Sequence, residues 1–220
     1  MKLLTSIPAN ASLRAQGVYK YACNGQPTGV REPWRIDELS DGALLVNVER
    51  DARAFGTTIL LAAVCHAPLA ALSFRRIEIL LTNEHETRAL YEFAGQVITF
   101  TRTVDDGAPQ RETFSLLDNA VVSPLMRVFL GATIQQVAAR GQGDAVPVLV
   151  PALENLQDTE RLLRPTFDQR RAVRQGDGCW QYLGERYDEQ SQFWLDASGL
   201  LIRYRFQQSA DTVWQVELTT

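Results

Sequence analysis

The residues of this chain best suited to acid–base chemistry are its two histidines, and their surroundings predict that neither is catalytic. His85 stands between Glu84 and Glu86. On a strand both carboxylates would point away from the imidazole, because successive side chains face opposite sides, and in a turn all three groups would be solvated. His66 follows Cys65 at the end of an apolar run, where we expect a strand-end or core residue. The sequence therefore predicts no catalytic residue.

Motifs for nucleophilic catalysis, phosphate binding and metal binding are missing. There is no Gly-x-Ser-x-Gly segment, and the glycine loop at 141–143 does not continue into a phosphate-binding sequence. Cys23, Cys65 and Cys179 are far apart and odd in number, which predicts neither a disulfide framework nor a zinc site and favours a reducing compartment. Two histidines are too few for a typical metal cluster. We predict no metal and no cofactor.

An arginine-rich segment, 163–171, is a candidate for anion binding. Arginine dominates the 22 basic residues of the chain, since only Lys2 and Lys20 are lysines. A guanidinium binds carboxylate or phosphate with two parallel hydrogen bonds, although a codon bias explains the same composition. The segment is either an anion-binding loop or an internal brace in which Asp168 pairs with an arginine. We favour the brace, because Asp168 is near enough in sequence to neutralise a partner.

Aromatic residues at alternate positions could form a stacking wall for a sugar or an apolar ligand. Trp180 and Tyr182, for example, share one face of a predicted strand. The alternative is that these aromatic side chains simply fill the core of a β-protein. The residues that we predict to bind a ligand are Tyr91, Trp180, Tyr182, Tyr204 and Arg164.

The elements that must position these residues are short strands, because the apolar residues recur with a period of two. We expect Arg76 and Glu78 to face the solvent, opposite Ile77. In a later segment we expect Ile202 to be buried on the same face as Tyr204. Such alternation is typical of antiparallel strands that are buried on one face only.

Fourteen strands are predicted, separated by turns that contain Asp or Gly. The predicted strands are 16–24, 30–38, 43–51, 57–65, 73–82, 87–94, 96–104, 110–116, 145–150, 169–175, 179–186, 191–196, 199–207 and 212–219. Open sheets curl or split near ten strands. The chain is therefore predicted to be mainly β, with a strongly curved antiparallel meander that forms a half-barrel or an open barrel.

One segment, 118–140, has apolar residues spaced by three and four, which predicts a helix. Ser123 is the predicted N-cap, with Pro124 in the first turn. Gly131 is expected to end or weaken this helix, so that the residues after it could form a strand instead. A second, weaker candidate is 154–163. One or two short helices should therefore lie against the concave face, the usual place for a ligand.

Composition sets the broad class of the protein. With 220 residues, 45% of them hydrophobic, and a net charge of −4, the chain is typical of globular proteins and unlike the basic proteins that bind nucleic acid. Its longest apolar run is far shorter than a membrane-spanning helix, and Pro8 and Asn10 interrupt the N-terminal apolar patch. We expect a cytoplasmic protein with one domain, 1–220, and an internal break only near 141–151.

The order of several short motifs resembles bacterial families of unassigned function that include the glycolipid-binding proteins, and is similar to the lipoprotein-carrier half-barrels. The motifs are Asp118 with Ser123-Pro124, Val148–Pro151, Arg164–Asp168, Phe193–Asp196, Gly199–Leu201, Tyr204, Trp214 and Leu218. The resemblance implies a curved antiparallel sheet that holds a lipid-like ligand, and it brings no catalytic residues. The N-terminal segment departs from the carriers, because it lacks a secretory apolar region.

The sequence leads to one main functional hypothesis and two alternatives. The main hypothesis is non-enzymatic binding of a hydrophobic or glycolipid-like small molecule in a concave β-sheet. The first alternative is a hydrolase or isomerase that acts on an apolar substrate and lacks a recognisable signature. The second is a structural or interaction protein that binds no ligand and forms a homodimer through its sheet.

Overall fold

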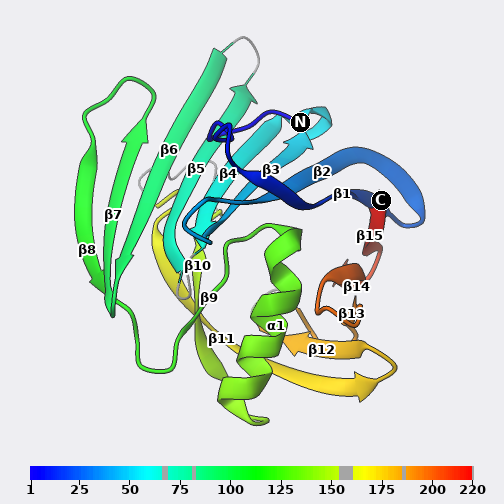
Figure 1. Ribbon diagram of the computed structural model, residues 1–220. Helices are drawn as coiled ribbons and strands as arrows, with labels where there is room; N and C mark the ends of the chain where they lie inside the picture. The colour runs from blue at the N-terminus through cyan, green and yellow to red at the C-terminus, as the bar shows by residue number, and fades with distance from the viewer. Residues whose placement is uncertain (66–68, 81–82, 154–160, 185–186, 220) are drawn as a thin grey trace.

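The period-two pattern of the sequence is realised as one sheet of 15 strands in the computed structural model (Figure 1). The structure describes residues 1–65, 69–80, 83–153, 161–184 and 187–219. The strands are β1 (Ser12–Cys23), β2 (Gln26–Glu38), β3 (Leu44–Ala52), β4 (Thr57–Cys65), β5 (Leu69–Leu80), β6 (Asn83–Ala94), β7 (Val97–Val104), β8 (Gln110–Ser115), β9 (Val121–Val122), β10 (Val146–Pro151), β11 (Pro165–Gly176), β12 (Cys179–Leu183), β13 (Gln192–Leu195), β14 (Leu201–Ser209) and β15 (Thr212–Thr219). The helices are a 3-10 turn at Arg53–Phe55 and α1 (Arg127–Gly141).

The sheet is built from two meanders that join in its middle. Strands β1 to β8 follow one another to one edge, strands β10 to β15 follow one another from near the other edge, and β15 pairs antiparallel with β1. All neighbours are antiparallel except β9 and β10, which are parallel and are connected through α1. The purely antiparallel sheet that the sequence predicts is thus interrupted at one edge, where a parallel pair needs a crossover helix.

The curvature of the sheet follows from its edges. Its two edge strands, β8 and β9, are consecutive in the chain, so only residues 116–120 separate them. At 3.3–3.6 Å per residue this link spans at most about 22 Å, far less than a flat sheet of this width would need. The prediction of a strongly curved, open sheet is confirmed. Strand β10, which lies in the segment where we expected an internal break, is part of the same sheet.

Helix α1 lies in the hollow of this sheet, against β9, β10, β11 and β14 (Figure 1). It runs through Gly131, so the predicted break there is wrong. A Cβ atom on Gly131 would lie 2.0 Å from the carbonyl oxygen of Gly199, which means that the glycine lets the helix touch the turn before β14. Close packing against backbone, and not helix termination, explains this residue.

The start of α1 also differs from the prediction. The helix begins at Arg127 and not near Ser123, because the Ser123 backbone N–H donates to the Leu149 carbonyl (2.9 Å) and continues the pairing of β9 with β10. Leu125 then turns the chain in the left-handed region, at φ 65°. The other helix candidate, 154–163, falls mostly outside the described residues. Among the described residues, no helix has the length and apolar character to span a membrane.

The concave face carries the core. One row across the sheet consists of Val48, Leu61, Phe74 and Ala89, all of them buried. Arg76 is two residues after Phe74 on β5, so its side chain also points to the concave side. The prediction that Arg76 faces the solvent is therefore wrong. Arg76 and Glu78 are 5% and 7% exposed, and their side chains pair at 3.0 Å. Ile77 lies on the other face, where it is half-buried.

The phase of β14 differs from the prediction because of a bulge. Trp194 pairs with Arg203 whereas the next residue, Leu195, pairs with Leu201, so Ile202 has no partner in the register. An unpaired residue in one strand shifts the alternation by one position. Leu201 is consequently buried and Ile202 is 41% exposed, contrary to the prediction, while Tyr204 is buried as expected.

Candidate ligand-binding site

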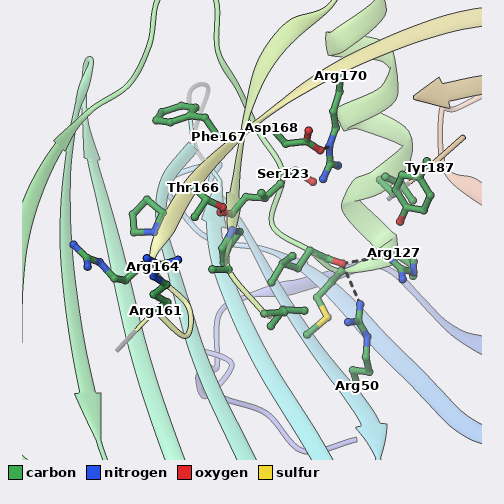
Figure 2. A pocket seen from close by; sticks show the side chains of 18 of the residues that line it. Arg50, Ser123, Arg127, Arg161, Arg164, Thr166, Phe167, Asp168, Arg170 and Tyr187 are labelled. Carbon is green, nitrogen blue, oxygen red and sulfur yellow. Dashed lines mark hydrogen bonds and ion pairs between the residues drawn. The ribbon is translucent and has the colours of Figure 1, made fainter. Parts of the chain in front are cut away.

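Two cavities lie on the concave side of the sheet, and Arg50 and Arg127 line both. The first has a volume of about 580 Å³ and lies between the start of α1 and strands β10 and β11 (Figure 2). The second has a volume of about 630 Å³ and is formed by residues of β1, β2, β3, β14 and β15. Both volumes fall in the range of small-molecule sites.

The first cavity has an apolar part and a cationic part. Its apolar lining comes from Phe114, Leu125, Met126, Leu130, Val150, Pro151, Ala152, Leu153, Pro165 and Phe167. Its charged lining comes from Arg50, Arg127, Arg161, Arg164, Arg170 and Asp168. Cations thus outnumber carboxylates on its wall, although several of these arginines have protein partners.

The second cavity is mainly aromatic. It is lined by Tyr21, Val30, Ala52, Phe55, Tyr204, Phe206, Gln208 and Trp214 together with the two shared arginines. The ring of Tyr204 is stacked between Phe193 and Phe206, with centroid distances of 5.3 and 5.7 Å. Phe193 belongs to β13, whereas Tyr204 and Phe206 belong to β14, and such stacked rings form a rigid wall because each ring restricts the rotation of the next.

A buried carboxylate contacts both of the arginines that the two cavities share. Glu32 is fully buried, and its Oε2 accepts from the Tyr21 hydroxyl (2.6 Å) and from Arg50 Nε (2.8 Å). Its Oε1 accepts from the backbone N–H of Arg127 at the start of α1. Burial, together with the charge of Glu32, raises the pKa of Tyr21 to about 12, so the phenol stays a donor. These contacts satisfy a charge that would otherwise be costly to bury.

The two shared arginines are held differently. Arg50 Nη2 donates to the Leu125 carbonyl at 3.0 Å, and Arg127 Nη1 approaches the same carbonyl at 3.4 Å, so both side chains converge there (Figure 2). The Arg127 guanidinium lies 4.9 Å from the ring centroid of Tyr204 and 5.8 Å from that of Tyr21. Its Nε atom is buried and has no hydrogen-bond partner. Arg127 is therefore oriented mainly by aromatic faces.

At the other end of the first cavity lies an arginine brace. Arg170 Nε binds Asp168 Oδ2 at 2.6 Å, and Arg170 Nη1 donates to the Tyr182 hydroxyl at 2.8 Å. Both charged side chains are about one-tenth exposed (9% and 11%). This pair confirms the internal brace that we favoured. Arg164, the residue before β11, instead pairs with Glu112 of the edge strand β8.

The structure brings two of the five predicted ligand-binding residues to the cavities. Arg164 lines the first cavity and Tyr204 the second. Tyr91 and Tyr182 are fully buried in the core, and the Tyr91 hydroxyl donates to the Leu163 carbonyl. Trp180 is half-buried and packs against the core. None of these last three lines either cavity.

Sequence reasoning missed the residues that join the two cavities. Arg50 is two residues after Val48 on the same strand, and side chains two residues apart share a face. The alternation of β3 was therefore enough to predict that Arg50 faces the concave side, like Val46 and Val48. Glu32 shares a face of β2 with Trp34 in the same way. Both were passed over because charged residues are expected on the solvent side of a strand. No strand pattern pointed to Arg127, because its position beside the cavities depends on where α1 begins.

His85 lines neither of the two cavities. His85 Nδ1 lies 3.1 Å from Asp105 Oδ2, with both side chains nearly half exposed (48% and 46%). His66 lies outside the described residues. In the part of the chain that the structure describes, no three His, Cys, Asp or Glu side chains group as metal ligands, and Cys23, Cys65 and Cys179 are free thiols.

The site is thus a pair of cavities, the first lined by apolar and cationic residues and the second mainly by aromatic residues, which share two arginines that contact one buried carboxylate. The resemblance to glycolipid-binding and lipoprotein-carrier families stays a prediction. The chain matches no family model, no curated protein and no solved structure, so its function has to be inferred from the geometry of this site.

Proposed function

We propose that the protein binds a hydrophobic small molecule, without chemical conversion, in the hollow between the curved sheet and α1. The observation that carries this proposal is the pair of cavities of about 580 and 630 Å³, the first with an apolar part beside its arginines and the second with a mainly aromatic wall. Burying an apolar ligand there is favourable by about 0.8 kcal/mol per methylene group. A chain of several methylenes would therefore bind without any specific polar contact.

The charged lining supports binding over catalysis. Among the described residues Asp168 is the carboxylate that lines the first cavity, and its Oδ2 is bound by Arg170 Nε at 2.6 Å, so it already belongs to a structural ion pair. His85 and its partner Asp105 are exposed and line neither cavity. A hydrolase or isomerase would need an acid–base group within hydrogen-bond reach of its substrate. The arrangement of the described residues gives that alternative no support.

Two further expectations belong to this proposal. A cytoplasmic location belongs to this proposal, and the three half-buried free thiols agree with it because cysteines in secreted proteins are usually found in disulfides. A lipid or glycolipid as ligand agrees with the family resemblance. The homodimer stays a prediction, which sedimentation of the purified chain would test.

Competition with Nile red, a neutral fluorescent probe, tests the proposal. We expect dodecanol to displace the dye saturably from the folded protein. Ala52→Phe fills the second cavity and Ala152→Phe the first, whereas Ala139→Phe adds the same ring on the exposed side of α1. At least one cavity variant should bind dodecanol about tenfold more weakly, with the control unchanged. Absence of saturable binding, or equal binding by all three folded variants, would overturn the proposal.

A further inference from the structure

We propose that the ligand is an amphipathic anion, whose carboxylate or phosphate group binds between Arg50 and Arg127 while its apolar part lies in the second cavity. This inference rests on the proposed function and adds the chemical class of the ligand. It comes from the position of the two arginines, which line both cavities and converge on the Leu125 carbonyl (Figure 2).

The first step of the argument is the charge balance at this point. Two guanidinium groups face one carboxylate, that of Glu32, and Glu32 binds the side chain of Arg50 but only the backbone of Arg127. Among the described residues the Arg127 side chain has no ion pair, and its Nε atom is buried without a partner. The Glu32 charge also acts on Arg127, so two cations share one carboxylate, which is unfavourable for half-buried groups, and an anion bound beside Arg127 would balance the second charge.

The second step is preorganisation. Glu32 and the Leu125 carbonyl hold Arg50, while the faces of Tyr204 and Tyr21 hold the guanidinium of Arg127. The arginines are therefore fixed before any ligand arrives, and binding an anion would order few additional side chains. Sites with such fixed donors bind more tightly than flexible ones, because less conformational entropy is lost.

The third step is what lies next to the arginines. Tyr204, over which Arg127 sits, belongs to the aromatic wall of the second cavity with Phe206 and Trp214. A headgroup at the arginines thus places the adjoining chain directly against aromatic rings. Apart from the arginines and the Tyr21 and Tyr204 hydroxyls, Gln208 is the polar side chain that lines this cavity. A sugar, which needs many hydrogen-bond partners, suits this lining less than an alkyl chain does.

A matched series of dodecyl compounds tests the inference by isothermal titration below their critical micelle concentrations. The probes are dodecanoate, dodecyl phosphate and dodecanol, with acetate and inorganic phosphate as anions without a chain. We expect the wild-type protein to bind dodecanoate or dodecyl phosphate about ten- to hundredfold more tightly than dodecanol. Acetate and inorganic phosphate should bind at least about a hundredfold more weakly than their dodecyl counterparts.

Variants assign the preference to the site. Arg127→Gln should abolish the preference for the anions, so that dodecanoate, dodecyl phosphate and dodecanol bind this variant with similar affinity. Arg75→Gln is the matched control, because Arg75 is 40% exposed and lines neither cavity. Arg127→Lys, which keeps the charge, should retain part of the preference. If Arg127→Gln fails to fold, added salt should weaken dodecanoate binding by the wild-type protein and leave dodecanol binding unchanged.

The outcomes separate this inference from the proposed function. Equal affinity of the wild-type protein for dodecanol and both dodecyl anions would overturn the anionic headgroup and leave the hydrophobic ligand standing. If neither the anions nor dodecanol bind, the proposed function itself fails. Tight binding of inorganic phosphate or acetate alone would show that the site takes a free anion, which contradicts the apolar part of the inference.

Discussion

The carboxylate of Glu32 lies at the N-terminus of α1, where it accepts the backbone N–H of Arg127, a residue 95 positions later in the chain. The helix has no side-chain cap of its own, since its N-cap residue is Met126. A negative charge at this end is favourable because it meets unpaired N–H groups and the positive end of the helix dipole. Glu32 of β2 therefore fixes the first residue of α1, and with it the position of the Arg127 side chain.

Replacing Glu32 should destabilise the protein strongly. Glu32→Gln removes the charge that pairs with Arg50 and caps α1, and we expect the free energy of unfolding to fall by about 2–4 kcal/mol. Glu38→Gln, on the same strand, breaks a pair between side chains that are 29% and 58% exposed, and should cost less than about 1 kcal/mol. Urea unfolding of both variants measures the difference. Equal losses would show that the Glu32 contacts contribute no more than a surface pair.

Adding one methyl group to α1 should disrupt its packing. Gly131→Ala raises intrinsic helix propensity, yet its Cβ would lie 2.0 Å from the carbonyl oxygen of Gly199. We expect a net loss of about 1–3 kcal/mol, from overpacking, in thermal or urea unfolding. The reverse change at the exposed neighbour, Ala132→Gly, should cost about 1 kcal/mol from propensity alone. A stabilised Gly131→Ala variant would contradict the close approach of helix and turn.

The bulge in β14 predicts losses of stability of different size for two neighbouring residues. Leu201→Ala removes a fully buried side chain and should cost about 2–5 kcal/mol. Ile202→Ala removes a side chain that is 41% exposed and should cost less than about 1 kcal/mol. The same unfolding assay compares them. A larger loss of stability for Ile202→Ala than for Leu201→Ala would mean that Ile202 is the buried residue, as the sequence predicts, and would exclude the bulge.

One pH dependence comes from the β7–β8 hairpin. A hydrogen bond from the Glu86 backbone (2.8 Å) and the contact with His85 hold the pKa of Asp105 below its usual value. A lowered pKa in the folded state stabilises the protein above the usual carboxyl pKa of about 3.9, and this contribution is lost as pH falls below that value.

Asp105→Asn should therefore lower stability at neutral pH by less than about 1 kcal/mol, because the side chain is nearly half exposed (46%). The difference from the wild-type protein should vanish at low pH. Asparagine also tolerates the backbone at position 105, where φ is 48°. Asp106→Asn, at an exposed neighbour, is the control. Urea unfolding at several pH values measures both, and a difference that is independent of pH would exclude the carboxylate as its source.

The strands were predictable because their pattern is local. Each of the fourteen predicted segments overlaps a strand of the structure, whereas β9, with two residues, was missed. Such a short strand has no period of its own and exists only because Val121 and Val122 pair with β10. The exposure of Ile202 was equally out of reach, since a bulge depends on the register with the neighbouring strand.

The candidate site was predictable only in outline. The one-faced pattern and the strand count led to a concave apolar surface, and Tyr204 was placed on it correctly. The polar groups of that surface were missed, because Arg50, Glu32 and Arg76 occupy inward positions that sequence patterns assign to apolar residues. Burial of Arg50 is compensated by Glu32 on a neighbouring strand at 2.8 Å, and such long-range pairing cannot be read from one sequence, whereas Arg76 pairs with Glu78 on its own strand.

Photoaffinity labelling tests the central claim most directly, because it shows where an apolar molecule lies on the protein. Dodecanol with a diazirine near its terminal carbon would be irradiated with the folded chain, and the adducts mapped by mass spectrometry. We expect labels in segments that line the cavities, such as 125–130 and 204–214, and loss of these labels when unlabelled dodecanol competes. Labels confined to exposed apolar side chains such as Leu13 and Ile202, unaffected by competition, would contradict binding inside the curved sheet.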